Sequence, residues 1–323
     1  MTIKKKAPTR TQNTSNPRYL WAFGKLIPWE EANVHITSMA WTSISAVFEG
    51  IRAYWNDKEK ELSVFRLDAH IKRLSNSMKL MRMVPPLGEN DIENAIAELL
   101  TSNKSRENIY IMPFAYFSGS VPGYKSAYQQ PAALFITAVP TESKLESNLG
   151  ISCCISSWTR ISDNSMPPRV KGISNYQNSR LVSTEAELNG YDAGIILNSQ
   201  GKVSESAYGC IFIIRDGVAY TPPTTADILE SITRDTIITL LQEDLNIPVQ
   251  VRDLDRTELY VSNEMFLCGT YAEIDPVISV DRYVIGNGNP GPITEKLMDI
   301  YKRLVYGESN LHHEWVSLIH IPD

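Results

Sequence analysis

The sequence predicts an α+β protein of two domains, and three observations support this prediction. The 323 residues are 43% apolar and 21% charged, an ordinary globular composition for a chain long enough to form two cores. Short β-rich runs alternate with helical stretches, so neither class dominates. The pattern lapses into a polar, proline-containing stretch at 139–143, which is typical of an interdomain connection.

These observations divide the chain into four parts. We expect a disordered polar tail at 1–18, a small α/β domain at 19–139, a short interdomain loop at 140–150 and a large domain at 151–323.

The first half contains four β-rich runs and two helical stretches. The runs are Tyr19–Phe23, Ala46–Tyr54, Ile109–Phe117 and Ala132–Val139. A helix is predicted from about Leu67 to Arg82, because Ile71, Leu74, Met78 and Met81 recur at helical spacing and Pro85-Pro86 follows. A second helix is expected at about Asp91–Ser102, where acidic residues suit its N-terminal end.

The second half alternates in the same way. Helices are expected at about 176–189, 232–245 and 293–305. An apolar run at 151–157 follows the interdomain connection, and strands are expected at 194–198, 211–214, 218–220, 249–252 and 265–268.

Charge and cysteine content exclude several classes of function. A net charge of -6 does not indicate the positively charged surface that binds nucleic acid or an anionic membrane. A small-molecule substrate is therefore expected. The four cysteines lack metal-ligand spacing and are interpreted as reduced thiols, and no metal site is predicted. The first residues lack the apolar segment of a secretory signal, and no apolar run approaches roughly 18 residues, so a cytoplasmic protein is expected.

Lys171 is the first candidate for chemistry. It lies in Pro167-Pro168-Arg169-Val170-Lys171-Gly172, an apolar, proline-stiffened segment in which burial would favour the neutral amine, a nucleophile toward an aldehyde. On composition alone, a surface lysine with its ammonium in water is the simpler interpretation.

The sequence around Lys171 decides between these interpretations. The run Pro168–Lys171 that continues into Asn175–Ser179 resembles the cofactor-lysine segment of branched-chain aminotransferases. Further family motifs keep their order and approximate spacing over residues from about 19 to 306: Ser45–Arg52, Gly190–Asp192, Val203–Glu205, Ile232–Arg234, Gly269–Glu273 and Gly291–Thr294. The resemblance implies the type IV pyridoxal-phosphate fold of two α/β domains, with pyridoxal 5′-phosphate as cofactor.

The resemblance also assigns roles to individual residues. It makes Lys171 the Schiff-base lysine, which afterwards moves the proton on the substrate α-carbon. Glu205 matches the carboxylate that pairs with the pyridine nitrogen and keeps it protonated, so that the ring accepts electrons. Tyr176 matches the tyrosine that is hydrogen-bonded to the cofactor's phenolic oxygen. The simpler alternative is an aromatic side chain of the hydrophobic core near a helix start.

A phosphate-binding group is implied as well. Arg73 matches the family's phosphate arginine, whose guanidinium fork suits a phosphate; the alternative is a solvated helix arginine. Ile232 and Thr233 fall at the start of a predicted helix, where free N–H groups and the helix dipole favour an anion, and Thr270 adds a hydroxyl and an amide. Leu229 completes the implied cofactor-binding set.

The substrate side departs from the family pattern. The family's tyrosine ahead of the Phe-Glu-Gly-Ile-Arg run is replaced by Ser43, its arginine in Tyr-Ile-Arg-Pro by Met112, and an alanine in Gly-Thr-Ala-Ala-Glu by Tyr271. Losing a charge-assisted hydrogen bond costs about 1.5 to 3 kcal/mol, which puts glutamate as the amino donor in doubt. The substrate-pocket residues implied by the resemblance are Phe48, Gly50, Arg52, Ser43, Met112, Tyr271 and Ala272.

Three functions compete on this fold. The first is a ping-pong aminotransferase with a rebuilt pocket, suited to a specialised pathway and to an amino acid or amine larger or more polar than leucine. The second is a lyase or other non-transaminating enzyme on the same cofactor site, as in aminodeoxychorismate lyases. The third is a non-catalytic binding protein, which the retained cofactor residues disfavour. The resemblance further implies a homodimer, in which a loop of one subunit completes its partner's pocket.

Overall fold

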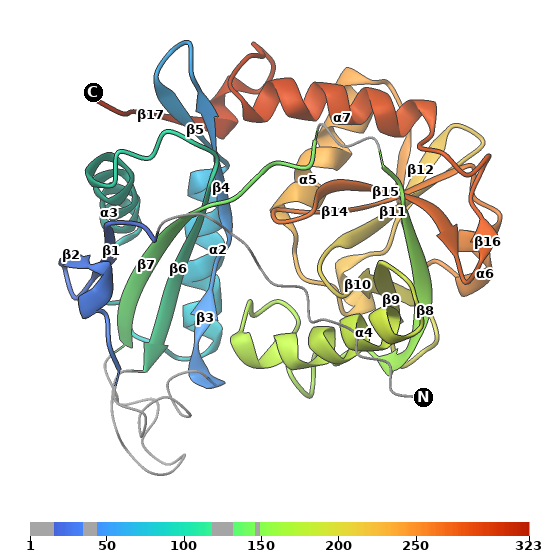
Figure 1. Ribbon diagram of the computed structural model, residues 1–323. Coiled ribbons are helices and arrows are strands. Elements are labelled where there is room, and N and C mark those ends of the chain that lie inside the picture. The colour runs from blue at the N-terminus through green and yellow to red at the C-terminus, as the bar shows by residue number, and fades with distance from the viewer. Residues whose placement is uncertain (1–15, 35–43, 118–131, 146–148, 323) are drawn as a thin grey trace, which may run out of the picture.

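The computed structural model describes residues 16–34, 44–117, 132–145 and 149–322, and in these residues the strands form two sheets. Figure 1 shows the two sheets side by side, with helices packed against both and α7 (Pro292–Val305) lying across the top. This mixed architecture confirms the α+β prediction.

The first sheet is antiparallel and has the strand order β17-β5-β4-β6-β7-β1-β2, with β3 paired to β6. Its strands are β1 (Tyr19–Ala22), β2 (Lys25–Pro28), β3 (Val47–Phe48), β4 (Ile51–Asn56), β5 (Glu61–Phe65), β6 (Ile109–Phe117), β7 (Ala132–Pro140) and β17 (Val316–His320).

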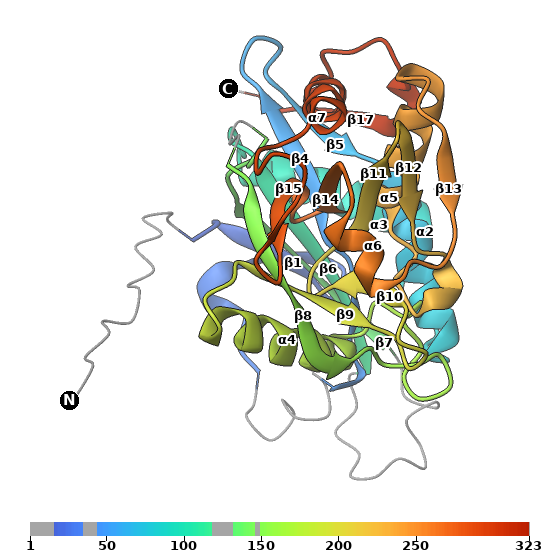
Figure 2. The same ribbon diagram turned by 90° about the vertical axis from the view of Figure 1, so that its right-hand side faces the viewer.

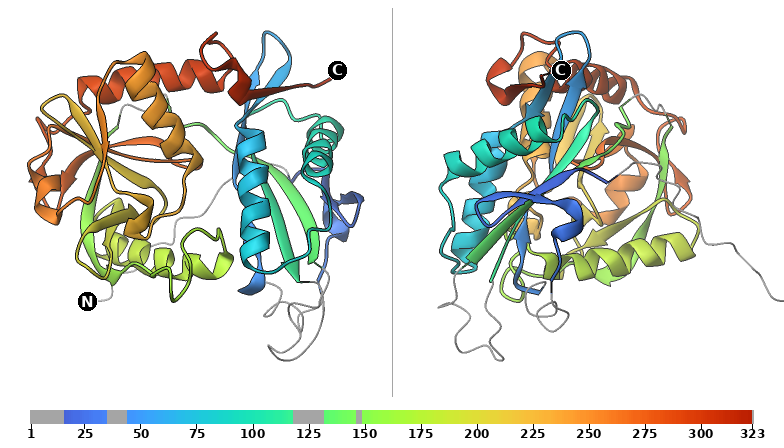
Figure 3. Two further views of the ribbon diagram at one scale, coloured as in Figure 1. Left: turned by 180° about the vertical axis from the view of Figure 1, so that it is seen from behind. Right: turned by 60° about the vertical axis from the view of Figure 1, so that its left-hand side comes forward.

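Two helices, α2 (Leu67–Leu80) and α3 (Glu89–Ser102), cover one face of this sheet (Figure 3). Their apolar residues share a core with Ile109, Ile111 and Ala115, which alternate along β6. Because side chains alternate between the faces of a strand, Tyr110 and Met112 lie on the opposite face. That face looks toward the second sheet.

The second sheet is mixed and has the order β10-β9-β8-β15-β14-β11-β12-β13, with β16 paired to β15. Three pairings are parallel in the described residues: β8 with β9, β8 with β15, and β12 with β13. The strands are β8 (Ile151–Thr159), β9 (Ala193–Leu197), β10 (Val203–Ser206), β11 (Cys210–Arg215), β12 (Val218–Thr221), β13 (Val249–Val251), β14 (Glu264–Gly269), β15 (Glu273–Val280) and β16 (Tyr283–Val284).

Helix α4 (Tyr176–Leu188) packs on β8 and β9, as Figure 2 shows, while α5 (Ile232–Thr239) and α7 pack against β14. Other helical segments whose bounds lie within the described residues are α6 (Arg256–Tyr260), the π-helical turn η5 (Leu240–Asp244) and the 3-10 turns η1 (Trp29–Glu31), η3 (Ile173–Asn175), η4 (Thr224–Ala226) and η6 (His313–Trp315). The helix predicted over 232–245 is therefore α5 followed by the π-helical turn.

Two features of the chain path differ from the expectation. The run predicted as one strand over Ala46–Tyr54 consists of two strands, β3 and β4, separated by Glu49-Gly50, although both pair with β6 in a single register and the Glu49 amide donates to the Pro113 carbonyl between them. The second is the division into domains: β17 returns to pair with β5, so the last strand belongs to the first sheet and not to the second. The apolar face of α7 packs on Phe65 and Tyr54 and brings the chain back to that sheet.

Within the described residues, no helix is long and apolar enough to cross a membrane. All four cysteines are free, and they are buried where half-buried thiols were expected.

Candidate active site

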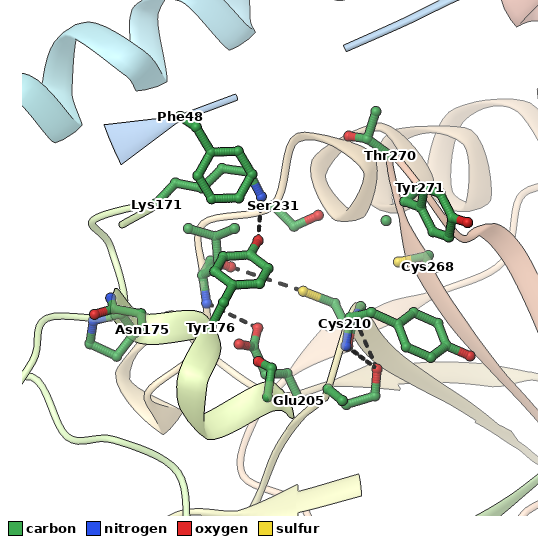
Figure 4. A pocket seen from close by; sticks show the side chains of 18 of the residues that line it. Phe48, Lys171, Asn175, Tyr176, Glu205, Cys210, Ser231, Cys268, Thr270 and Tyr271 are labelled. Atoms are coloured by element: carbon green, nitrogen blue, oxygen red, sulfur yellow. Dashed lines mark hydrogen bonds between the residues drawn. The ribbon is translucent and has the colours of Figure 1, made fainter. Parts of the chain in front are cut away.

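A cavity of about 270 Å³ lies where the two sheets face each other. It is lined by Phe48 and Tyr110 from the first sheet, by Arg73 from α2, by the 168–179 segment and by residues of the second sheet and its loops. Figure 4 shows Lys171, Tyr176 and Phe48 on one side of the cavity and Thr270 and Tyr271 on the other. This volume is near the lower end of roughly 300–1,000 Å³, the range common for small-molecule sites.

The Lys171 amine projects into the cavity. Its Nζ donates to the Tyr176 hydroxyl at 2.6 Å and lies 4.9 Å above the centre of the Phe48 ring. The main chain of Lys171 is fixed from the first sheet, since its carbonyl accepts from the Phe48 amide at 3.0 Å. Among the described residues, no carboxylate lies within ion-pair distance of this amine, so it remains available to an aldehyde.

Glu205 is the only carboxylate among the residues that line the cavity in the described part of the chain. One of its oxygens forms an ion pair with Arg160 Nη2 at 2.6 Å, and the other accepts from the Leu229 amide at 3.1 Å. Both side chains of the ion pair are nearly buried, with exposures of 5% and 10%. Each carboxylate oxygen keeps a second lone pair, so Glu205 has capacity to accept from a ligand N–H.

After Lys171 and Glu205, a third polar feature of the cavity lies where the Arg73 side chain meets the start of α5. Arg73 Nη1 donates to the Glu230 carbonyl at 2.7 Å, next to Ser231, whose hydroxyl caps the helix by accepting from the Arg234 amide. The cap leaves the amides of Ile232 and Thr233 without a helical acceptor. A guanidinium and a free helix N-terminus together are suited to an anion.

These three groups fit pyridoxal 5′-phosphate. A free amine, a carboxylate and an anion-binding helix start surround one cavity, and they complement the aldehyde, the pyridine nitrogen and the phosphate of that cofactor. Lys171 would hold the aldehyde carbon, Glu205 the ring nitrogen, and Arg73 with the start of α5 the phosphate.

Aromatic side chains form the remaining wall of the cavity. The Tyr110 and Tyr271 rings meet edge to face with their centroids 5.8 Å apart. Gly50 lies directly behind Tyr110, because a Cβ on this glycine would be 1.9 Å from the Tyr110 hydroxyl oxygen. Tyr208 also lines the wall, and burial together with the charge of Asp275 raises the pKa of its hydroxyl.

The structure brings most of the predicted cofactor residues together. Lys171 lies at the cavity with Arg73, Tyr176, Glu205, Leu229 and Thr270. Ile232 and Thr233 do not line it with their own atoms but follow Ser231, which does.

The predicted substrate residues are less closely grouped. Phe48 and Tyr271 line the cavity, whereas Gly50, Met112 and Ala272 do not. Arg52 does not line it either: its guanidinium is buried and donates to the carbonyls of Thr270, Tyr271 and Glu142. Arg52 therefore supports the loop that carries Thr270 and Tyr271. Ser43 lies outside the described residues.

Sequence reasoning missed two charged residues of the site. Arg160 follows the end of β8 and is far from Glu205 in the sequence, so no local spacing predicts their ion pair. Glu49 belongs to the Ser45–Arg52 motif, but no role of its own was predicted for it. In the structure it binds Arg73 through both carboxylate oxygens. An acidic residue inside an otherwise apolar strand run was the available signal.

Comparison with known proteins agrees with this geometry. Residues 46–280 match the family model of class IV aminotransferases. The chain belongs to the class IV aminotransferases. It is similar to a probable branched-chain-amino-acid aminotransferase of Aquifex aeolicus, with 39% identity over 92% of this chain and 95% of the relative.

Solved structures show the same family fold. The branched-chain amino acid aminotransferase of Thermobaculum terrenum in its pyridoxal-phosphate form superimposes with a TM-score of 0.92 at 46% identity, covering 94% of this chain and 99% of that one. The branched-chain aminotransferase of the thermophilic archaeon Thermoproteus uzoniensis with norvaline gives a TM-score of 0.86 at 37% identity, covering 93% and 99%. The chain is thus a branched-chain-aminotransferase-like enzyme that depends on pyridoxal 5′-phosphate.

Proposed function

We propose that this aminotransferase takes an amino acid or amine larger or more polar than leucine and passes its amino group to a 2-oxo acid by a ping-pong mechanism. The observation that carries the proposal is the aromatic wall of the cavity, in which Tyr271 packs edge to face on Tyr110. The family pattern has an alanine at this position. A ring there narrows the space for a branched aliphatic chain and offers a face and a hydroxyl to a flatter or more polar group.

The chain's own residues supply the proton chemistry. When bound, pyridoxal 5′-phosphate accepts the substrate's amino group and draws electrons from its α-carbon. The Lys171 amine, oriented by its 2.6 Å bond to Tyr176, is the group that moves a proton at that carbon. Glu205, held by Arg160 and the Leu229 amide, keeps the proton on the ring nitrogen.

Charge at the cavity disfavours glutamate as the amino donor. The cations that line the described part of the cavity are Arg73, Arg160 and Lys171, and the first two already bind Glu49 and Glu205. Met112 stands where the family has an arginine, on the same face of β6 as Tyr110. A side-chain carboxylate would therefore enter without the partner that offsets its desolvation.

The test is to mix the purified holoenzyme with single amino acids and follow the visible absorbance of the cofactor. We expect conversion to the pyridoxamine form to be faster with phenylalanine or tyrosine than with leucine, and slowest with glutamate. Lys171→Ala serves as the control without the proton-carrying amine. Efficient exchange between leucine and 2-oxoglutarate contradicts the proposed specificity, and a persistent aldehyde-form band while product accumulates identifies a lyase instead.

We further propose that the enzyme is a cytoplasmic homodimer. The family resemblance supports the dimer, in which a loop of one subunit completes its partner's pocket. Light scattering coupled to size exclusion measures the mass directly, and a monomer that retains full activity argues against shared pockets.

A further inference from the structure

Glu49 is a fully buried carboxylate at the junction of β3 and β4. Its Oε1 accepts from Arg73 Nε at 2.7 Å, and its Oε2 accepts from Arg73 Nη2 at 2.8 Å. The ring of His70, one helical turn before Arg73 on α2, places Nδ1 2.8 Å from the same Oε2. Both Glu49 and His70 are about as buried as the core leucines.

The protonation states of this cluster follow from its contacts. Burial works to raise the pKa of the Glu49 carboxyl, but the charge and hydrogen bonds of Arg73, with the hydrogen bond of His70, lower it to about 2. Burial lowers the pKa of His70, so its ring is neutral at pH 7. An ionised carboxylate only accepts, and therefore the proton of His70 sits on Nδ1.

The Glu49 contacts determine which donors Arg73 has left. A guanidinium carries five N–H groups in a planar fork. Nε and one hydrogen of Nη2 go to Glu49, and one hydrogen of Nη1 goes to the Glu230 carbonyl. One N–H on each terminal nitrogen remains, and Arg73 lines the cavity beside Ser231 at the start of α5.

The Arg73 guanidinium is therefore hydrogen-bonded to both halves of the molecule. Glu49 belongs to the first sheet, whereas Glu230 precedes the helix start that packs on the second. A side chain with free rotamers loses conformational entropy when it binds an anion, and an arginine already fixed at three of its N–H groups loses much less. The fixed orientation of Arg73 therefore favours binding of a phosphate.

We propose that Glu49 is a positioning residue for cofactor binding: it fixes the Arg73 fork so that the two remaining N–H groups face the cofactor phosphate, with His70 holding Glu49 in place. The inference rests on the placement of the phosphate at Arg73 and is independent of which amino acid the enzyme uses. A carboxylate at this position would otherwise oppose a bound phosphate, but its charge is already neutralised by the arginine that it orients.

A purely structural ion pair is the competing explanation, and the two make different predictions. Loss of a structural pair lowers the stability of the protein and weakens all ligands alike. Loss of a positioning residue weakens only ligands that carry a phosphate. Pyridoxal, which has the aldehyde but no phosphate, separates these cases.

The experiment measures the dissociation constants of pyridoxal 5′-phosphate and of pyridoxal for apoprotein of wild type and Glu49→Gln, by absorbance titration. Glutamine has the same size but carries no charge and accepts through only one of its two terminal atoms, since the other is an NH2 donor. We expect the phosphorylated ligand to bind roughly tenfold or more weakly and pyridoxal to change by less than about twofold. Glu258→Gln is the matched control, because Glu258 forms a similar two-oxygen pair with Arg252 away from the cavity and should leave both constants unchanged.

Equal weakening of both ligands, or unchanged binding of pyridoxal 5′-phosphate, overturns the proposal. Arg73→Lys tests the underlying placement separately: if it leaves binding of the phosphorylated cofactor unchanged, the phosphate lies elsewhere. If Glu49→Gln does not fold, Glu49→Asp is measured with the same criteria. Aspartate keeps the charge but is one methylene too short to reach both nitrogens.

Discussion

Replacing Gly50 by alanine tests the packing behind the substrate wall. The new Cβ would be 1.9 Å from the Tyr110 hydroxyl oxygen and 2.5 Å from its Cζ. Ordinary contact begins at 3.4 Å, so the phenol has to move by about 1.5 Å. Gly50 is buried in the backbone of the first sheet, and the ring therefore has room to move only toward the cavity and Tyr271.

Such a shift narrows the substrate site but leaves the cofactor groups in place. Overpacking of this kind costs about 1–3 kcal/mol. If a bound substrate must push the ring back against that strain, kcat/KM falls roughly five- to 150-fold, mainly through KM. The affinity for pyridoxal 5′-phosphate stays unchanged, because Lys171, Glu205 and the start of α5 do not touch Gly50.

The assay is steady-state kinetics with the best amino acid found, together with cofactor titration. Gly88→Ala is the control: its Cβ meets only the end of the Asp91 side chain, at 3.2 Å, and its backbone φ of -70° suits alanine. Unchanged kinetics in Gly50→Ala refutes the assignment of Tyr110 as a tightly packed wall, and loss of cofactor affinity shows that the strain spreads beyond it.

Three further predictions concern charges. Met112→Arg restores the family's cation on the face of β6 that carries Tyr110, so kcat/KM for glutamate should rise roughly ten- to hundred-fold, and no gain would contradict our account of donor choice. Arg160→Met removes the ion-pair partner of Glu205 in the apoprotein, so the protonated ring nitrogen of added cofactor restores a missing charge partner. The increase in melting temperature on adding cofactor should therefore exceed that of wild type. An equal increase would mean that Glu205 does not pair with the ring nitrogen. The folded-state pKa of Glu49 is about 2 against an ordinary 4.5, so its charge stabilises the fold above pH 4.5 and this stabilisation is lost as the pH falls toward 2. The difference in unfolding free energy between wild type and Glu49→Gln should shrink over that interval in urea titrations, and a constant difference would contradict the pairing.

Local patterns in the sequence were sufficient for most of the fold. The spacing of apolar residues along α2 predicts its buried face, and β6 has the bounds that its β-branched and aromatic run predicts. The family motifs singled out Lys171 as the candidate cofactor lysine, with Glu205 and Arg73 as its candidate acidic and basic partners, and the structure brings these residues to one cavity.

What could not be predicted depends on contacts between distant segments. The pairing of β17 with β5 joins residues that lie at opposite ends of the chain, and its short, mostly exposed sequence gives no alternating pattern. The Arg160–Glu205 and Glu49–Arg73 pairs arise only when strands, loops and α2 meet in space. Arg52 shows the reverse case, since a motif residue expected in the substrate pocket supports that pocket from behind.

The central claim, that the cofactor is bound through Lys171, has one direct test. Borohydride reduction fixes a lysine-bound cofactor to its lysine, and trypsin then fails to cleave at that residue. We predict a tryptic peptide covering residues 170–180, uncut at Lys171 and heavier by the mass of the reduced phosphopyridoxyl group. The same mass on any other lysine of the coloured protein contradicts the account.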